Sequence, residues 1–390
     1  MLLAMVALSL ARLAYGVLLP FMRVDLEWSV EQAGILGTAT SLGYLLCVLP
    51  AGYLTRRYGP RHIIIGGLVC AIVGFSGLYI VHSFTGFVVL MVLLGIGTAG
   101  IYTPVVSFIV GWFPQRRGLV LGMVNSGIGL GVFISGILLP WIAGGNQSDG
   151  WRRAWLLFAV FSTVLLVLAY SSIRNPVQCS GAVIQKSPIA AKRDSFISSE
   201  VYTYPSVRLI GLCYFILGFT YIVQAVFMYS YAIESGVSRI TAGQLSSVAG
   251  LLSIVAGFFW GTLSDVIGRS GTLIICFTCG AIATFIPVFL PTPAGFTFHY
   301  LLAGAVISGL FATILAATSE SVPPREVPLA IGFVTTLFAV GQLLGPIVAA
   351  WIIGSSGSFG IAFIFSATTM LAGSVIAWQL SRLPASGAQR

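Results

Sequence analysis

The stretch Gly52-Tyr-Leu-Thr-Arg-Arg-Tyr-Gly-Pro-Arg-His62 is a short basic turn between two long apolar segments. A related stretch, Gly261-Thr-Leu-Ser-Asp-Val-Ile-Gly-Arg-Ser270, follows 209 residues later, so that Gly52 aligns with Gly261 and the second glycines of the two stretches also align. Self-similarity at a long fixed period indicates an internal repeat. The sequence therefore predicts a duplication.

The same offset recurs, within one residue, on both sides of this turn. Glycines and prolines keep it in four further places: Ala33-Gly34 with Ala242-Gly243, Pro114 with Pro324, Gly122 with Gly332, and Gly131 with Gly341. We therefore predict an N-terminal half over residues 1–172, a linker over 173–204 and a C-terminal half over 205–390.

The composition predicts a membrane protein. The 390 residues are 57% apolar and only 7% charged, whereas charged residues make up about a quarter of a soluble domain. Apolar runs of roughly 20 residues are long enough to cross a hydrocarbon core as helices. Twelve such runs are present, at 2–22, 31–54, 62–82, 85–110, 118–141, 153–172, 205–233, 241–263, 271–290, 297–320, 328–353 and 359–381. The fold class expected is an all-α membrane protein with twelve transmembrane helices in two six-helix repeats.

The basic residues between the spans predict the orientation. If residue 1 lies in the cytoplasm, that side receives fourteen of them: Arg56, Arg57, Arg61, Arg116, Arg117, Arg174, Lys186, Lys192, Arg193, Arg208, Arg269, Arg325, Arg382 and Arg390. The other side receives Arg23, Arg152, Arg153 and Arg239. Because Lys and Arg are retained in cytoplasmic loops, both termini are expected to be cytoplasmic.

Several other classes of protein are not expected. The positive-inside bias accounts for the net charge of +9, so a nucleic-acid partner is not expected; a nucleic-acid binder would cluster its basic residues on one soluble face. No Gly-x-x-x-x-Gly-Lys-(Ser/Thr) loop is present to hold nucleotide phosphates. The spans carry neither paired carboxylates nor a His cluster. We expect a non-enzyme without a cofactor or a metal, driven by a gradient of ions or solutes.

The twelve spans, the six-plus-six duplication and the two basic turns together resemble the major facilitator superfamily of transporters. The signature of that superfamily runs approximately Gly-x-x-x-Asp-(Arg/Lys)-x-Gly-x-(Arg/Lys). Gly52, Arg57, Gly59 and Arg61 match it, whereas Arg56 stands where the acid is usual. The second copy keeps the acid as Asp265 but has Val266 at the following basic position.

The resemblance carries further expectations. The opening stretch Ala11-Arg-Leu-Ala-Tyr-Gly-Val-Leu-Leu-Pro-Phe-Met-Arg-Val-Asp-Leu-Glu-Trp-Ser29 is similar to a poorly characterised bacterial branch of the superfamily. This implies a monomer in the bacterial inner membrane, with the lipid bilayer as its surroundings. It also implies a substrate cavity between the halves, lined mainly by the first and fourth spans of each half with faces of the second and fifth.

Arg12 is the first candidate for the chemistry. It lies ten residues into its predicted span, which is about 15 Å at 1.5 Å per residue and near the middle of a core about 30 Å thick. A cation at this depth costs at least about 2.5–3.5 kcal/mol to insert, so it normally faces water or a partner. The alternative is that its side chain reaches the cytoplasmic surface. An unpaired guanidinium in a wet cavity would bind a carboxylate or a phosphate.

Other polar and aromatic residues occur at similar depth in the spans that the resemblance assigns to the cavity. Tyr15 is placed best, because three residues of helical spacing put it on the same face as Arg12. At an offset of 209 residues, Arg12 corresponds to Tyr221 and Tyr15 to Gln224. Each could instead form hydrogen bonds between helices. The full set of candidate substrate-binding residues is Arg12, Tyr15, Tyr44, Tyr102, Asn125, Tyr221, Gln224, Thr335, Phe338 and Gln342.

The basic turns are predicted to act as a gate. Because Arg56 replaces the usual acid of the first turn, we expect Asp265 of the second turn to approach the start of the fifth span. Two attractions exist there for a carboxylate: the positive end of a helix and Arg116-Arg117. The predicted gate residues are Gly52, Arg57, Gly59, Arg61, Arg116, Arg117, Asp265, Gly268 and Arg269.

The function expected from these features is secondary transport of a small organic anion of carboxylate type by alternating access, with or without accompanying protons. The alternative is a proton-coupled antiporter that exports amphipathic drugs or metabolites, with Arg12 as a gate or a structural charge. A preference for anionic ligands would favour the first hypothesis. Affinity for bulky hydrophobic cations would favour the second.

Overall fold

A computed structural model of the chain describes residues 1–112, 117–144, 149–173, 201–323 and 326–383. Twelve helical segments in this part of the chain are long and apolar enough to cross a membrane, and their ends lie within a few residues of the predicted ones. The first segment combines three elements, α1 (Leu2–Ala4), η1 (Met5–Leu13) and α2 (Ala14–Leu26). The other elements are α3 (Val30–Tyr58), α4 (Pro60–Ile80), α5 (Phe84–Trp112), α6 (Arg117–Ala143), α7 (Gly150–Ser172), η3 (Val201–Thr203), α8 (Pro205–Glu234), α9 (Arg239–Ile267), α10 (Arg269–Phe289), α11 (Pro293–Glu320), α12 (Val327–Ser356) and α13 (Phe359–Ser381).

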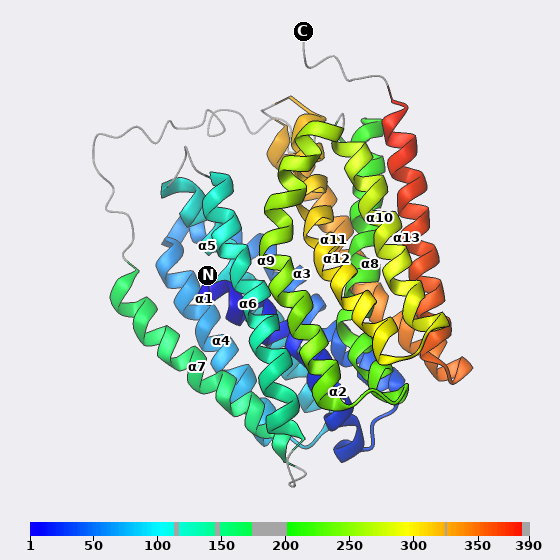
Figure 1. The fold of residues 1–390 in the computed structure, drawn as a ribbon. Coiled ribbons are helices and arrows are strands. Elements are labelled where there is room, and N and C mark those ends of the chain that lie inside the picture. The colour runs from blue at the N-terminus through cyan, green and yellow to red at the C-terminus, as the bar shows by residue number, and fades with distance from the viewer. Residues whose placement is uncertain (113–116, 145–148, 174–200, 324–325, 384–390) are drawn as a thin grey trace.

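The helices form two groups, α1 to α7 and α8 to α13. In Figure 1, α4 to α7 lie toward the left and α8 and α10 to α13 toward the right, with α3 and α9 between them. Within the first group α5 packs against α3 and α4, and within the second α10 packs against α11 and α13. The most extensive contacts between the groups, among the described residues, are those of α3 with α12, α6 with α9, and α2 with α8.

The two basic turns have the same backbone conformation. Gly59 between α3 and α4 has φ 85° and ψ 155°, and Gly268 between α9 and α10 has φ 86° and ψ 155°. Glycine adopts a positive φ without the steric cost that a side chain adds. We call the end of the bundle that holds these turns the motif end. The opposite end is where α3 and α9 begin, at Val30 and Arg239.

The hydrophobic core joins the two groups at the opposite end. One continuous cluster of buried side chains contains most of the first group and also Val226 of α8, Ala350 of α12 and Phe363 of α13. A second cluster belongs to the C-terminal group alone and includes Val207 of α8 and Leu273 of α10. Helices start and end alternately at the two ends. The residues that the C-terminal group contributes to the shared cluster therefore lie toward the opposite end, and those of the separate cluster lie toward the motif end.

Helix crossings are closest where the core is continuous. A Cβ on Gly34 would collide with Ala350 and Pro346 of α12, and a Cβ on Gly243 would collide with Gly136 of α6. By contrast, a Cβ on Gly261, in the motif turn, would meet nothing within 4 Å. The two groups therefore pack closely at the opposite end, whereas Gly261 at the motif end has no neighbour from the other group.

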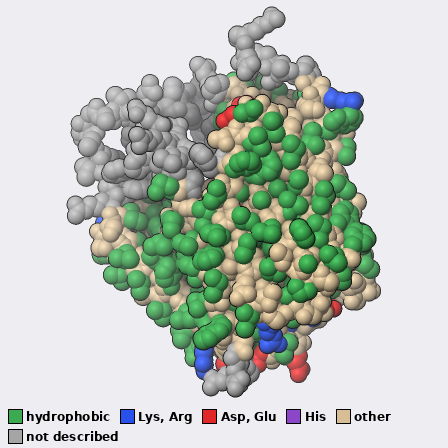
Figure 2. Space-filling view, in the orientation of Figure 1, with side chains coloured by type: hydrophobic (Ala, Val, Ile, Leu, Met, Phe, Trp, Pro, Cys, Tyr) green, Lys and Arg blue, Asp and Glu red, His purple; other side chains and the backbone are tan. Residues whose placement is uncertain are grey.

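The outer surface suits a bilayer. In the face that Figure 2 shows, hydrophobic side chains cover the sides of the helices, and charged side chains gather at the two ends. Large exposed hydrophobic residues such as Val167, Phe289 and Trp351 belong to this surface. In the absence of water, each spanning segment satisfies its own backbone groups as a helix.

Candidate functional site

The first span is not a regular α-helix where it approaches Arg12. Met5–Leu13 is a π-helix, and the N–H of Ala14 donates to the carbonyl of Ser9, five residues back. The hydroxyl of Thr98 on α5 donates to the carbonyl of Ala7 at 2.7 Å. A side chain that bonds to a helix carbonyl in this way can help to hold a wider turn. π-Helical turns are frequent at functional sites, and this one carries Arg12.

The guanidinium of Arg12 lies between the two groups of helices. Its Nη2 donates to Oγ of Ser41 on α3 at 3.0 Å and to Oε1 of Gln342 on α12 at 2.8 Å. The guanidinium carbon also lies 5.2 Å from the ring centroid of Tyr44. Only 7% of Arg12 is exposed. Arg12 thus links the N-terminal group to the C-terminal group at the floor of the opening.

Arg12 carries a charge without a counter-charge. Its hydrogen bonds and its ring contact are all with neutral groups, and the described residues form no ion pair with it. The buried Nε has no hydrogen-bond partner among them. Arginine has five N–H donors in a planar fork that matches a carboxylate or a phosphate. The geometry therefore leaves donors of Arg12 available to an anion.

Aromatic side chains of the C-terminal group surround the approach to Arg12. Tyr221 of α8 lies near Arg12, and its ring meets Phe311 of α11 edge to face at 5.6 Å. Phe338 of α12 stacks on Tyr214 of α8 at 4.5 Å. Phe311 and Phe338 are 5.4 Å apart, so the four rings form one cluster.

The N-terminal group contributes a polar pair beside this cluster. The hydroxyl of Tyr102 on α5 donates to Oδ1 of Asn125 on α6 at 2.8 Å. Asn125 is exposed, although it lies well inside a spanning helix, and Tyr102 is partly exposed. The phenol of Tyr214 lies near those of Tyr44 and Tyr102. Tyrosines of both groups therefore face the same space, which Asn125 also borders.

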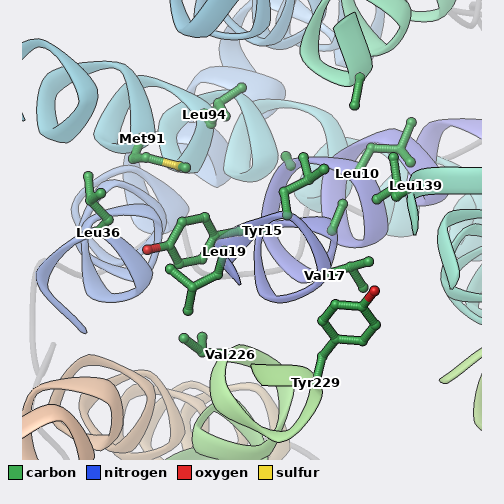
Figure 3. Close-up of a cluster of buried hydrophobic side chains, with 14 of the residues drawn as sticks. Leu10, Tyr15, Val17, Leu19, Leu36, Met91, Leu94, Leu139, Val226 and Tyr229 are labelled. Carbon is green, nitrogen blue, oxygen red and sulfur yellow. The ribbon is translucent and has the colours of Figure 1, made fainter. Parts of the chain in front are cut away.

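Two predicted residues lie away from Arg12. The first, Tyr15, is 1% exposed and packs among Leu19, Leu36 and Met91 (Figure 3). Its hydroxyl donates to the carbonyl of Ala33 at 2.9 Å. The prediction of a shared face with Arg12 assumed α-helical spacing, whereas the π-helix up to Leu13 changes the register.

Gln224 also lies outside the group around Arg12. Its Nε2 lies 3.7 Å from Sδ of Met370 on α13, within the C-terminal group. Thr335 is partly exposed on α12, one turn from Phe338. The structure thus brings together Arg12, Tyr44, Tyr102, Asn125, Tyr221, Phe338 and Gln342 of the predicted set.

Sequence reasoning missed Ser41, Tyr214 and Phe311. Tyr214 precedes Tyr221 by two helical turns, so helical spacing could have found it. Phe311 belongs to the fourth span of the C-terminal half, one of the spans assigned to the cavity, but carries no polar atom. Ser41 gave no signal, because serine is a common small residue between membrane helices.

The first basic turn binds to its own group of helices. Nη2 of Arg61 donates to the carbonyl of Tyr170 on α7 at 2.8 Å, and its guanidinium lies 5.0 Å from the Tyr170 ring centroid. The guanidinium of Arg57 lies 5.3 Å from the ring centroid of Tyr58. A Cβ added to Gly52 would have a side-chain atom of Thr103 on α5 as its nearest neighbour, at 4.0 Å.

The second basic turn forms a charged cluster. Nη2 of Arg269 lies 2.6 Å from Oδ1 of Asp265 and 2.7 Å from Oε1 of Glu320. Arg269 also donates to Oγ of Ser264. The cluster ties α9, α10 and α11 together. Arg116 and the side chain of Arg117 lie outside the described residues, so the expected approach of Asp265 to them stays a prediction.

Relatives of known name are transporters. Monocarboxylate transporter 12 of Xenopus laevis is 24% identical over 364 residues, which cover 85% of this chain and 76% of the relative. The hexuronate transporter of Bacillus subtilis is 22% identical over 374 residues, covering 92% and 87%. The oxalate:formate antiporter of Oxalobacter formigenes is 27% identical over 234 residues, covering 59% and 54%.

Solved structures share the fold. A D-xylose-proton symporter matches with a TM-score of 0.81 at 14% identity, over 100% of this chain and 97% of the other. A bacterial homologue of the human lysosomal transporter Spinster, described as inward-facing and occupied, matches with a TM-score of 0.76 at 16% identity, over 97% and 95%. Residues 4–378 match the model of a family described as "Uncharacterised MFS-type transporter YbfB". The twelve spans, the paired turns and this match over nearly the whole sequence show that the chain belongs to that family of the major facilitator superfamily, a family of multi-pass membrane transporters.

Proposed function

We propose that this protein is a secondary transporter that moves a small organic anion across the bacterial inner membrane by alternating access. The observation that carries the proposal is the burial of Arg12 between the two groups of helices with neutral partners alone. Since a cation in the bilayer interior is costly, it normally serves an ion or substrate pathway. Its free donors suit a carboxylate.

Arg12 also explains how binding could change the conformation. The bond from Arg12 to Gln342 joins the two groups at the closed end of the opening. An anion that engages the guanidinium competes for its donors and weakens this link. Such a ligand interacts differently with the state in which this link is formed and the state in which it is broken. This difference is the condition for shifting the populations of the two states.

Names of the relatives support an anionic substrate. A monocarboxylate transporter, a hexuronate transporter and an oxalate:formate antiporter are among them. By the distribution of basic residues, the motif end faces the cytoplasm and both termini lie there. In this scheme, close packing at the opposite end corresponds to an inward-open state.

Proton coupling does not need a side-chain carrier in this scheme. No Asp or Glu is among the buried side chains of the described residues. A proton would therefore accompany the substrate, or an exchange of anions would need none. Glu320, at the motif end of α11, is bound to Arg269 and largely exposed.

Reconstitution of the purified protein in proteoliposomes tests the proposal, with labelled lactate, glucuronate and oxalate as probes. Saturable uptake of at least one probe is expected. Arg12→Ala should abolish it, and Arg12→Lys should not restore it, because an ammonium does not reproduce the fork of the guanidinium. Arg208→Ala, which removes an exposed arginine, is the matched control.

Two results would contradict the proposal. One is wild-type uptake by Arg12→Ala. The other is uptake of bulky hydrophobic cations with no uptake of any anion, which would favour the antiporter hypothesis. Thermal unfolding of each variant shows whether a loss of uptake reflects a loss of folding.

A further inference from the structure

The aromatic cluster beside Arg12 forms a continuous surface. We call Tyr214, Tyr221, Phe311 and Phe338 the aromatic wall. Tyr214 and Phe338 are stacked with an interplanar angle of 24°, and Phe311 meets Tyr221 at 89° and Phe338 at 76°. These are the stacked and edge-to-face arrangements that aromatic rings favour. The wall is therefore organised before any ligand arrives.

The wall lies between Arg12 and the motif end. Gln342 holds Arg12, and Phe338 precedes it by one turn of α12, on the side of the motif end. On α3, Tyr44 likewise lies one turn beyond Ser41 in the same direction. An anion that reaches Arg12 through the open end must pass the wall. Once bound, its remaining atoms lie beside these rings.

Exposure supports contact between the wall and a ligand. Within the wall, Tyr214 and Phe338 are buried. Tyr221 and Phe311 are partly exposed, as are Tyr44 and Tyr102 on the facing group. These four belong to the interior of the protein, since each interacts with other members of the site. Their exposed surface therefore faces the space between the groups and not the lipid.

The chemistry of the wall selects the group that is attached to the carboxylate. The wall offers two rings without a hydrogen-bonding group, Phe311 and Phe338, next to the phenols of Tyr214 and Tyr221. A ligand with hydroxyls against the two phenylalanine rings would lose hydrogen bonds to water without replacing them, and such losses discriminate strongly. A flat apolar group would instead add ring contacts of the kind already present.

We infer that the substrate is an aromatic or similarly flat apolar monocarboxylate, whose carboxylate binds Arg12 and whose ring packs on the aromatic wall. The inference rests on the proposed function, because it places the carboxylate on Arg12. It adds the substrate class and assigns the four wall residues to specificity.

Competition in the proteoliposome assay tests the inference, with phenylacetate, lactate and glucuronate as probes. Phenylacetate should bind most tightly to the wild type. Phe338→Leu keeps apolar volume but removes a ring. It should raise the KM for phenylacetate about 3- to 10-fold, from the strength of one aromatic pair, and change that for lactate less than about twofold. Phe289→Leu, on the outer surface, should change neither.

The outcomes separate the inference from the proposed function. If carboxylates are transported through Arg12 but phenylacetate has no advantage, or if Phe338→Leu weakens all probes equally, the inference is wrong and the proposed function stands. If no carboxylate is transported by the wild type, both are wrong. An advantage of phenylacetate that Phe338→Leu removes and Phe289→Leu preserves supports the inference.

Discussion

Helices α3 and α9 each carry two glycines that differ in their surroundings. Gly34 of α3 and Gly243 of α9 touch the backbone or side chains of the other group, with no room for a Cβ. Gly52 and Gly261, five turns further along the same helices, have open space around them. Since Gly34 pairs with Gly243 and Gly52 with Gly261 in the repeat, the duplication supplies both an engaged pair and a free pair.

The two ends differ in the forces available to them. At the opposite end, helices meet through small residues and share a hydrophobic core, so that contact is made by close packing. At the motif end, the described contacts include the ion pairs of the partly buried Arg269 with the exposed Asp265 and Glu320, all within the C-terminal group. Exposed ion pairs contribute about 0–1 kcal/mol each. Contact at the opposite end should therefore respond strongly to a change in side-chain volume, and contact at the motif end should respond weakly to a change in side-chain charge.

The largest effect is expected from overpacking the engaged glycine. Gly243→Leu should force α6 and α9 apart. Overpacking costs about 1–3 kcal/mol. This cost changes the ratio between the state closed at the opposite end and the state open there by up to about a hundredfold. Transport should fall at least tenfold (about 1.4 kcal/mol). Spin labels at Glu27 and Ser355 should move apart at the opposite end.

The free glycine provides the contrasting variant. Gly261→Leu meets nothing in this state but should hinder closure of the motif end, so that labels at Tyr58 and Val266 stay apart. Gly66→Leu, on open surface of α4, serves as the control for both. If Gly243→Leu and Gly261→Leu changed the motif-end distance, between Tyr58 and Val266, in the same direction, the two ends would not open alternately.

A second variant changes the polar link at the floor of the opening. Gln342→Glu places a carboxylate beside Arg12, so the charge is neutralised across the two groups. Separating a buried ion pair is costly, because each charge is then left buried without a partner. We expect the affinity for anionic probes to fall about tenfold, or about 1.4 kcal/mol, with little loss of thermal stability.

Gln224→Glu is the matched comparison. It buries the same carboxylate beside Met370, where no cation lies among the described neighbours, and should lower the melting temperature by several degrees. Equal stability losses in the two variants would show that Arg12 does not act as an accessible charge.

A smaller effect is expected for Asp265→Asn at the motif end. The wetted attraction of Asp265 to the start of α6 would be worth about 0.3–1 kcal/mol, and Asp265 also loses its pair with Arg269. The fraction open at the motif end should rise a few-fold at most, without unfolding. Arg56→Asp should have the reverse effect. An unchanged distribution of distances between Tyr58 and Val266 in Asp265→Asn would place the gate elsewhere.

The smallest effect is expected for Glu320→Gln. It removes a side chain that is 55% exposed and bound to Arg269. Uptake driven by a pH gradient and exchange without a gradient should both stay within about twofold of the wild type. A twofold change corresponds to about 0.4 kcal/mol. Loss of gradient-driven uptake with exchange intact would identify Glu320 as the proton carrier.

Much of the fold is determined by local sequence. Long apolar runs at regular intervals predict each spanning helix, because in a bilayer every segment must satisfy its own backbone. The paired turns were also visible, since only glycine suits the positive φ at Gly59 and Gly268. Arg12 was a candidate from its depth alone, because a charge in hydrocarbon requires a reason.

The neighbours of Arg12 were decided by tertiary structure. Arg12 lies in a π-helix and Tyr15 in the α-helix that follows it, although their spacing predicts a common face. The partners Ser41 and Gln342 come from helices 29 and 330 residues away. Which end of the repeat is closed was undetermined too, because paired glycines have the same local sequence preferences. Only the packing of one half against the other distinguishes the engaged pair, Gly34 and Gly243, from the free pair.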